Sequence, residues 1–212
     1  VAPNVLIVLD NSANWKASFG GGTKFSSEIA TLSSVIGGLG ANVNVGLMMF
    51  GETGSGNATP VTAYVRFAVR NMATANKSAL QTLISNLEID DDKGSNAPYG
   101  FTLYEAFKYF GGGGATLTPQ DSQHFGATAY GGFGQRKRDY AGNTVANTAG
   151  ALPGNAFAAA SGNTYLSPVT DSCQKTYVVF INNGMPQAGA DSGNPSASTL
   201  LQNVGGSNAV TT

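Results

Sequence analysis

The chain has little charge, one cysteine and one histidine in its 212 residues. A lone Cys173 excludes an internal disulfide framework and leaves three alternatives: a buried inert thiol, a free thiol or a bond to another chain. The only histidine, His124, lies in a stretch without a recognisable motif, so a histidine-based catalytic triad is unsupported. Charged residues make up 11% of the chain, against roughly 25% in typical soluble domains. This composition favours an extracellular protein.

A basic stripe of the kind that binds nucleic acid is also missing, and so is a long apolar run. The net charge is −1, and the short run Arg136-Lys137-Arg138 is followed at once by Asp139, which is typical of a solvated loop. We therefore expect no nucleic-acid partner. No apolar run approaches the roughly 18 residues of a membrane span, so no span is predicted. The hydrophobic content of 42% is enough for one large α/β domain.

Hydrophobic periodicity predicts alternating strands and helices. Strands are expected at 5–9, 43–50, 61–69 and 176–181, the third being an antiparallel edge strand and the last a buried one. Helices are expected at 23–39 with Thr23 as N-cap, at 76–87, from Thr102 to 110, and at 197–204. The Gly- and Ala-rich stretch 111–171 has no sustained period and is interpreted as a surface insertion, with short helical pieces near 156–160.

These elements predict an α/β fold, a doubly wound, mostly parallel sheet with flanking helices. The whole chain, 1–212, is taken as one domain that contains the 111–171 insertion. Because only one strand follows the insertion, one side of the sheet is expected to be short. We interpret the domain as incomplete at its C-terminus.

Polar residues directly follow two of the predicted strands. Asp10, Ser12 and Asn14 come after the first strand, and Asn183 follows the last. In open α/β sheets the binding crevice lies at the carboxyl ends of the strands, so these side chains are candidates for a site. The alternative is a structural role, because Asp, Asn and Ser are also common turn residues. Asp10 is the hardest to assign to a turn alone, since an acid at the end of a buried strand needs a partner.

With Thr102, these residues resemble the metal-ion-dependent adhesion site of von Willebrand factor A domains. That motif is usually D-x-S-x-S after the first strand, a threonine from a middle loop, and T-D-G after the fourth strand. Here the residues in those places are Asp10, Ser12, Asn14, Thr102 and Asn183. The resemblance implies a von Willebrand factor A or Rossmann-like fold, and a divalent cation that bridges to an acidic group on a partner without any bond-breaking chemistry.

A narrower resemblance is to the N-terminal domain of PilY-type adhesins of type IV pilus tips. It rests on TLYEAFKYF and on YLSPVTDSCQKTYVVFINNGMP, and it covers roughly residues 3–110 and 163–187. The resemblance implies a non-enzymatic adhesion or pilus-biogenesis module outside the cell, at the pilus tip. Its expected partners are pilus subunits (minor pilins) and a host or abiotic surface.

The chain departs from the adhesion motif at two positions. Asn14 replaces a serine, and Asn183 replaces an aspartate, which removes a negative charge. Hard cations prefer oxygen ligands with carboxylates among them, so Mg²⁺ or Ca²⁺ is expected to bind weakly or not at all. A metal-free scaffold that docks on pilin subunits is therefore an alternative. A hydrolase with an aspartyl nucleophile is a further one, which Ser12 disfavours because such enzymes usually place a second Asp there.

Several other residues have competing structural interpretations. Thr102 with Glu105 three residues later is a capping-box signature, so Thr102 is expected to cap its helix as well as, or instead of, binding a cation. Asn183 before Gly184 suits a turn that needs positive φ. Trp15 is either a surface anchor or a lid on the sheet. The run at 90–92 is interpreted as a solvated acidic loop, because its spacing fails the EF-hand pattern.

Overall fold

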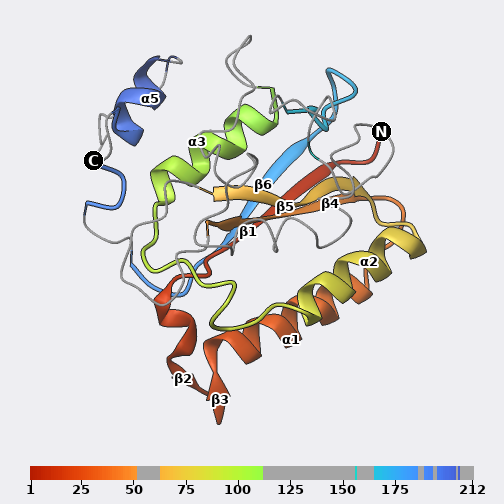
Figure 1. The fold of residues 1–212 in the computed structure, drawn as a ribbon. Coiled ribbons are helices and arrows are strands. Elements are labelled where there is room, and N and C mark those ends of the chain that lie inside the picture. The colour runs from red at the N-terminus through yellow and green to blue at the C-terminus, as the bar shows by residue number, and fades with distance from the viewer. Residues whose placement is uncertain are drawn as a thin grey trace.

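Four strands form one mixed sheet in a computed structural model of the chain (Figure 1). The sheet order is β5-β4-β1-β6, and the strands span Asn4–Leu9 (β1), Asn44–Phe50 (β4), Ala63–Asn71 (β5) and Thr176–Ile181 (β6). Strands β4 and β6 pair parallel to β1, and β5 pairs antiparallel to β4 at the edge, as predicted. The structure describes residues 1–51, 63–111, 156, 165–185, 189–192, 195–203 and 205.

Helices cover both faces of this sheet, which confirms the predicted α/β layering. Figure 1 shows α1 and α2 together below the sheet and α3 above it. Their bounds, with those of the smaller elements, are Lys24–Gly37 (α1), Thr74–Ser85 (α2), Tyr99–Tyr109 (α3), Ala197–Asn203 (α5), Ala13–Lys16 (the 3-10 helix η1), Ser18–Phe19 (β2) and Gly22–Thr23 (β3). Thr23 caps α1 as predicted, because its hydroxyl accepts from the Ser26 N–H at 3.1 Å.

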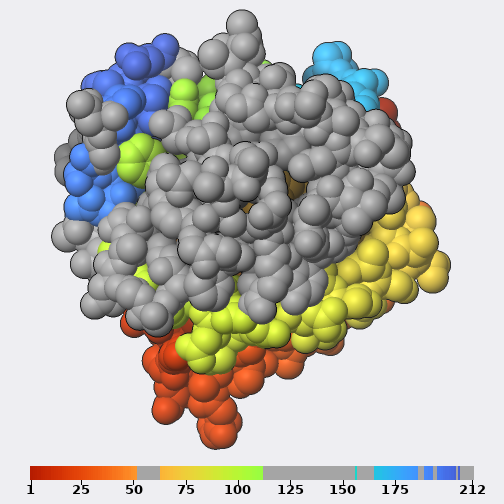
Figure 2. All heavy atoms as spheres, in the orientation of Figure 1, coloured from red at the N-terminus to blue at the C-terminus, as the bar shows by residue number. Residues whose placement is uncertain are grey.

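Alternate residues of β1 enter two separate cores. Ile7 and Leu9 pack with α1 and α2, while Leu6 and Val8 pack on the opposite face with α3. This two-sided burial is what a continuous apolar run predicts for a strand inside a parallel sheet. The N-terminal segment containing η1, β2 and β3, orange to red in Figure 2, forms the lower edge of the molecule, beside the yellow-green loop after α2.

Strand β6 differs from the prediction in its burial. Tyr177, Val178 and Val179 remain 49%, 41% and 46% exposed. Among the strands that the structure describes, β6 has β1 as its one neighbour in the sheet. Its β-branched and aromatic composition therefore reflects how such side chains fit a pleated surface, and it does not report burial on both faces.

The start of α3 corrects the predicted capping box. The helix begins at Tyr99, and the Thr102 hydroxyl donates to the Pro98 carbonyl at 2.8 Å inside the first turn. The helix N-terminus is instead capped from a distance, since the Asp191 carboxylate accepts from the Gly100 and Phe101 N–H groups at 2.9 and 3.0 Å. Pro98 directly precedes the helix. Proline suits a helix start because the backbone N–H that it lacks would be unpaired there.

The acidic loop at 90–92 is only partly solvated, because burial increases from Asp90 through Asp91 to Asp92. Asp90 is exposed and pairs with Lys16, but Asp92 is fully buried and lies 3.6 Å from the Arg66 guanidinium. Asp92 also accepts from the Glu88 N–H at 2.7 Å. The prediction of a wholly solvated loop was therefore wrong, because a buried arginine requires this carboxylate.

Most of the proposed insertion at 111–171 lies outside the described residues, and so do His124 and the predicted helical pieces near 156–160 apart from Ala156. Residues 165–171 are described and join the main body, where Asn4 donates to the Pro168 carbonyl at 3.0 Å. Cys173 is exposed, which contradicts the buried-thiol alternative. In the part of the chain that the structure describes, no helix is long and apolar enough to cross a membrane.

Gly46 in β4 lies where the neighbouring strand β5 approaches most closely. A Cβ atom at this position would lie 2.6 Å from Val69 Cγ2 and 2.9 Å from the Phe67 carbonyl oxygen. We expect Gly46→Ala to lower the free energy of unfolding by about 1–3 kcal/mol, because the strands must separate. Urea titration measures the change. Gly38→Ala is the control, since its nearest atom would be 3.5 Å away, and an equal loss in both variants would contradict this account.

Candidate site at the carboxyl ends of β1 and β6

The predicted polar residues after β1 and β6 lie together. The Asp10 N–H continues the ladder to the Ile181 carbonyl at 2.9 Å. The Asn183 side-chain amide donates to the Asp10 carbonyl at 2.7 Å, and the Ser12 hydroxyl donates to Asn183 Oδ1 at 3.3 Å. Because β1 and β6 are adjacent and parallel, residues 173 positions apart in sequence meet at one edge of the sheet.

The Asp10 carboxylate is the centre of this arrangement. It is 1% exposed, and its oxygens accept from the Ser12 N–H at 2.9 Å, the Tyr99 hydroxyl at 2.5 Å and the Asn183 N–H at 3.3 Å. Three donors thus replace the water that the carboxylate would otherwise bind. The need of Asp10 for a partner, predicted from its position, is met by the protein itself.

Tyr99 is the site residue that the sequence did not reveal. Its hydroxyl reaches Asp10 and also lies 3.1 Å from the Gly184 carbonyl, and its ring packs edge-on against Phe180 at 4.7 Å between centroids. Burial, followed by the hydrogen bond to Asp10 and the charge of Asp10, raises the pKa of Tyr99 above its ordinary value. A tyrosine hydroxyl is protonated at neutral pH even without this shift, so it is available to donate.

Thr102 is the fourth residue of α3, at the end of its first turn, and is fully buried. Its hydroxyl donates within its own helix to Pro98. A hydroxyl from the α3 segment does reach Asp10, but it is that of Tyr99. Among the five residues predicted for the site, Asp10, Ser12 and Asn183 are joined by hydrogen bonds, and Thr102 bonds elsewhere.

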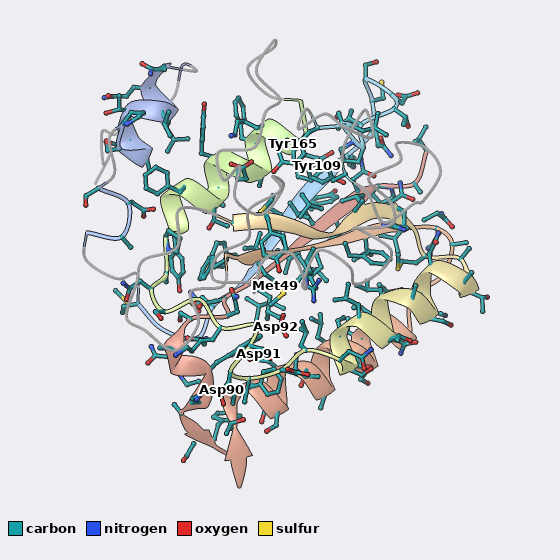
Figure 3. All side chains as sticks on the ribbon, viewed as in Figure 1. Met49, Asp90, Asp91, Asp92, Tyr109 and Tyr165 are labelled. Carbon is teal, nitrogen blue, oxygen red and sulfur yellow. The ribbon has the colours of Figure 1, made fainter. Side chains whose placement is uncertain are left out.

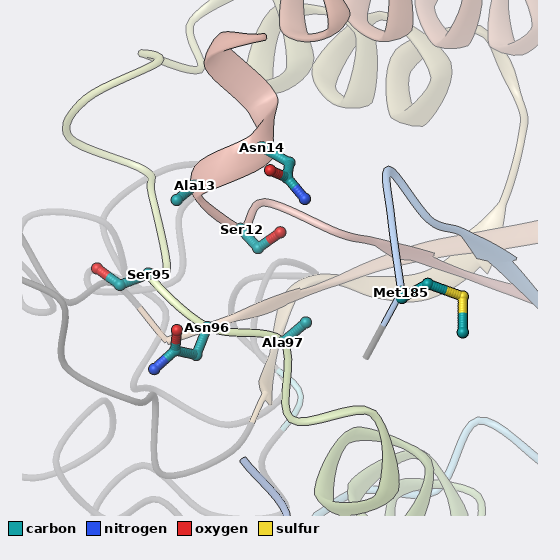
Figure 4. Close-up of a pocket in the computed structure, with 7 residues that line it drawn as sticks. All are labelled: Ser12, Ala13, Asn14, Ser95, Asn96, Ala97 and Met185. Carbon is teal, nitrogen blue, oxygen red and sulfur yellow. The ribbon is translucent and has the colours of Figure 1, made fainter. Parts of the chain in front are cut away.

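Asn14 is exposed and lies at the rim, on η1. Its amide nitrogen is so close to Gly184 that a Cβ atom there would lie 2.7 Å from it. Figure 4 shows Ser12 and Asn14 on one side of a pocket, the 95–97 segment on another and Met185 on a third. The cavity measures about 430 Å³, within the usual range for ligand sites.

A second group of contacts ties α1 to this edge. The Lys24 ammonium donates to the Asn183 carbonyl at 2.5 Å, and the Trp15 indole N–H donates to Glu28 Oε2 at 2.5 Å. Burial raises the pKa of Glu28, and the charge of Asp10 adds to that shift while the Trp15 hydrogen bond and Lys24 oppose it. Trp15 is fully buried and packs edge-on against Phe25 at 4.7 Å. It is therefore a lid and not a surface anchor.

Asn11 next to the site has a structural role that its position in a predicted turn did not indicate. Its side-chain amide donates to the Phe50 carbonyl at 2.9 Å and to the Asp92 carbonyl at 2.6 Å, while its oxygen accepts from the Phe50 N–H at 2.8 Å. The side chain therefore continues the pairing between the ends of β1 and β4, and it holds the buried turn at Asp92 against them.

Two of the side chains expected to hold a cation make hydrogen bonds to protein groups. Asn183 Oδ1 accepts from Ser12, and the Thr102 hydroxyl is bonded within α3. No cluster of three or more His, Cys, Asp or Glu side chains suited to a metal occurs among the described residues. Mg²⁺ requires near-octahedral oxygen ligands with a carboxylate or two among them. A cation bound by all five predicted residues would therefore rest on one carboxylate, that of Asp10, and on neutral oxygens from the other four.

In comparisons with known proteins, no protein-family model matches the chain and no curated protein sequence is significantly similar to it.

Proposed function

We propose that the chain is a partner-binding module of the von Willebrand factor A type, acting in adhesion or pilus biogenesis at the tip of a type IV pilus. This proposal rests on the motifs in the sequence and on an α/β sheet whose parallel strands end in polar residues at one edge. The partners would be minor pilins and a host or abiotic surface. The cell-surface location follows from the same resemblance and from the low charge of the chain.

The observation that carries the proposal is the contact set of Asp10. A buried carboxylate held by three protein donors supports the shape of the crevice without a cation. The open polar pocket beside it offers a contact surface at the edge where α/β domains bind ligands. We therefore propose direct contact with the partner, in which Mg²⁺ or Ca²⁺ is at most a weak addition. The buried position of Asp10 also disfavours a role as an attacking nucleophile.

A bulky substitution at the rim tests whether the crevice is the binding face. Ala13 is exposed and lines the pocket. Ala41 is also exposed, but it lies just before β4, at the amino ends of the parallel strands and so away from the pocket. We expect Ala13→Arg to weaken saturable binding of the labelled chain to purified type IV pili at least tenfold, because the long side chain fills the pocket. Ala41→Arg adds the same charge away from the crevice and is expected to leave binding unchanged.

The same measurement in EDTA and in millimolar Mg²⁺ separates the two forms of the proposal. Equal binding in both solutions is the expected result. Binding that disappears in EDTA would restore the cation to the mechanism. Equal binding by wild type, Ala13→Arg and Ala41→Arg would contradict the crevice, and would favour a scaffold that docks through another surface. Absence of saturable binding to pili, cells and abiotic surfaces would contradict the adhesion function itself.

A further inference from the structure

The pocket beside Asp10 is polar but carries no charge in its described lining. It is lined by Ser12, Ala13, Asn14, Ser95, Asn96, Ala97 and Met185. These residues supply hydroxyl, carboxamide, methyl and thioether groups, as the close-up shows (Figure 4). A ligand that enters this pocket meets uncharged donors and acceptors together with small apolar surfaces. A charged ligand group would lose its hydration without gaining a counter-charge there.

Asn14 provides the recognition group of the pocket. Its carboxamide makes no hydrogen bond to any residue in the described part of the chain. The side-chain nitrogen lies close to Gly184, since a Cβ atom added at that glycine would be 2.7 Å from it. An exposed carboxamide offers two N–H donors and a carbonyl acceptor side by side. Another amide matches that pattern with two complementary hydrogen bonds.

We propose that this pocket recognises a carboxamide of the protein partner, namely an Asn or Gln side chain, through Asn14. The proposal deepens the crevice-binding function proposed above and rests on it. The ligand's aliphatic carbons would contact Met185, which is 87% exposed and flexible enough to adapt to them. Recognition of this kind needs no cation and no acidic residue on the partner.

Two other ligand classes fit the pocket less well. A carboxylate would approach the Asp10 carboxylate, whose donors are already used by the protein, and like charges repel. A sugar ring usually gains from an aromatic face, and the described lining of this pocket contains none. Trp15, the nearest aromatic residue in sequence, is fully buried.

Met185 gives a direct readout of binding. The chain has four methionines, and the other three, Met48, Met49 and Met72, are almost completely buried. In the full 212-residue chain labelled with ¹³C at the methionine methyls, we expect N-acetylglutamine amide to shift the Met185 signal saturably in EDTA. The three buried methyl signals serve as internal controls. N-acetylglutamate N-methylamide, which bears a carboxylate in place of the side-chain carboxamide and has no primary amide, is expected to give no saturable shift.

Matched asparagine variants assign the effect to Asn14. We expect Asn14→Ala to weaken the affinity for N-acetylglutamine amide at least tenfold. Asn86→Ala removes another exposed asparagine, at the end of α2, and is expected to bind as wild type. Because both residues are exposed, neither substitution is expected to unfold the chain. Unchanged signals of the buried methionines in each variant would verify that it is folded.

Four outcomes would overturn the inference. These are a stronger response to the glutamate probe, a response to N-acetylglucosamine but not to the carboxamide, a shift that requires Mg²⁺, and no Met185 shift at all. If one of them occurs while wild type still binds pili and Ala13→Arg does not, only the carboxamide inference fails. If binding to pili is itself absent, the proposed function fails first.

Discussion

Replacing Glu105 with alanine is expected to lower the free energy of unfolding by about 3–5 kcal/mol, the usual cost of breaking a buried ion pair. Glu105 lies on α3 with no exposed surface, and its carboxylate accepts from Lys108 Nζ at 3.0 Å and from the Tyr165 hydroxyl at 2.6 Å. The alanine variant would leave the Lys108 ammonium buried beside a cavity. This effect is the largest on stability that we expect from one substitution in the described chain.

The hydrogen bond from Tyr165 to Glu105 also attaches the segment that precedes β6 to α3. Tyr165 packs edge-on against Tyr109 at 5.3 Å between ring centroids, and Figure 3 shows the two rings together on the α3 side of the sheet. Chemical denaturation followed by tryptophan fluorescence reports the loss, since the single Trp15 lies in the other core. A loss below 1 kcal/mol would contradict the buried-pair account.

A double substitution separates the charge from the packing. Glu105→Leu with Lys108→Met removes both charges and keeps the side-chain volume, and such replacements of buried pairs are often neutral or stabilising. We expect the double variant to recover most of the stability that Glu105→Ala loses. Equal destabilisation in both variants would show that the Tyr165 hydrogen bond, and not the buried charge, dominates the cost.

Local sequence patterns predicted the elements well, but they did not predict contacts that close over long sequence separations. The apolar run of β1 and the helical spacing of α1 depend on neighbouring residues only, and both elements formed as expected. The start of α3 could not be predicted from neighbouring residues. Its cap is Asp191, which lies 91 positions beyond Gly100 in sequence, so the nearer Thr102 and Glu105 mimicked a capping box.

The site likewise contains contacts that the sequence predicted and contacts that it did not. The position of Asp10 at a strand end was enough to predict its meeting with Asn183, because adjacent parallel strands bring their carboxyl ends together. The role of Tyr99 was not predictable, since it depends on where α3 starts and how far that helix lies from β1. The sequence therefore pointed to Thr102 of the adhesion motif in this segment and missed Tyr99.

Replacing Asn183 with aspartate is expected to make the stability of the domain depend on divalent cations. The amide of Asn183 donates to the Asp10 carbonyl at 2.7 Å, and a carboxylate in its place would face that oxygen without a proton to donate. It would also add a second negative charge beside Asp10. In EDTA we expect a loss of about 1–3 kcal/mol, the cost of an unmade buried hydrogen bond.

Added Mg²⁺ should reverse that loss in the variant and leave wild type unchanged. Two carboxylates form the minimal set that commonly holds this ion, and a cation at 100 times its dissociation constant contributes about 2.7 kcal/mol. Thermal unfolding in EDTA and in Mg²⁺ measures both effects. Asn182→Asp is the matched control, because it adds the same charge to the exposed neighbouring residue and should show no response to Mg²⁺.

The results of this experiment distinguish charge from geometry at the site. Recovery in Mg²⁺ would mean that a carboxylate at position 183 is enough to create a cation site among these residues. A variant that stays destabilised in Mg²⁺ would place the cause in the contacts of Tyr99 and Thr102, which commit their hydroxyl groups to protein acceptors. A cation-dependent gain in wild type would contradict our expectation, because it would require Asp10 to exchange its protein donors for the metal.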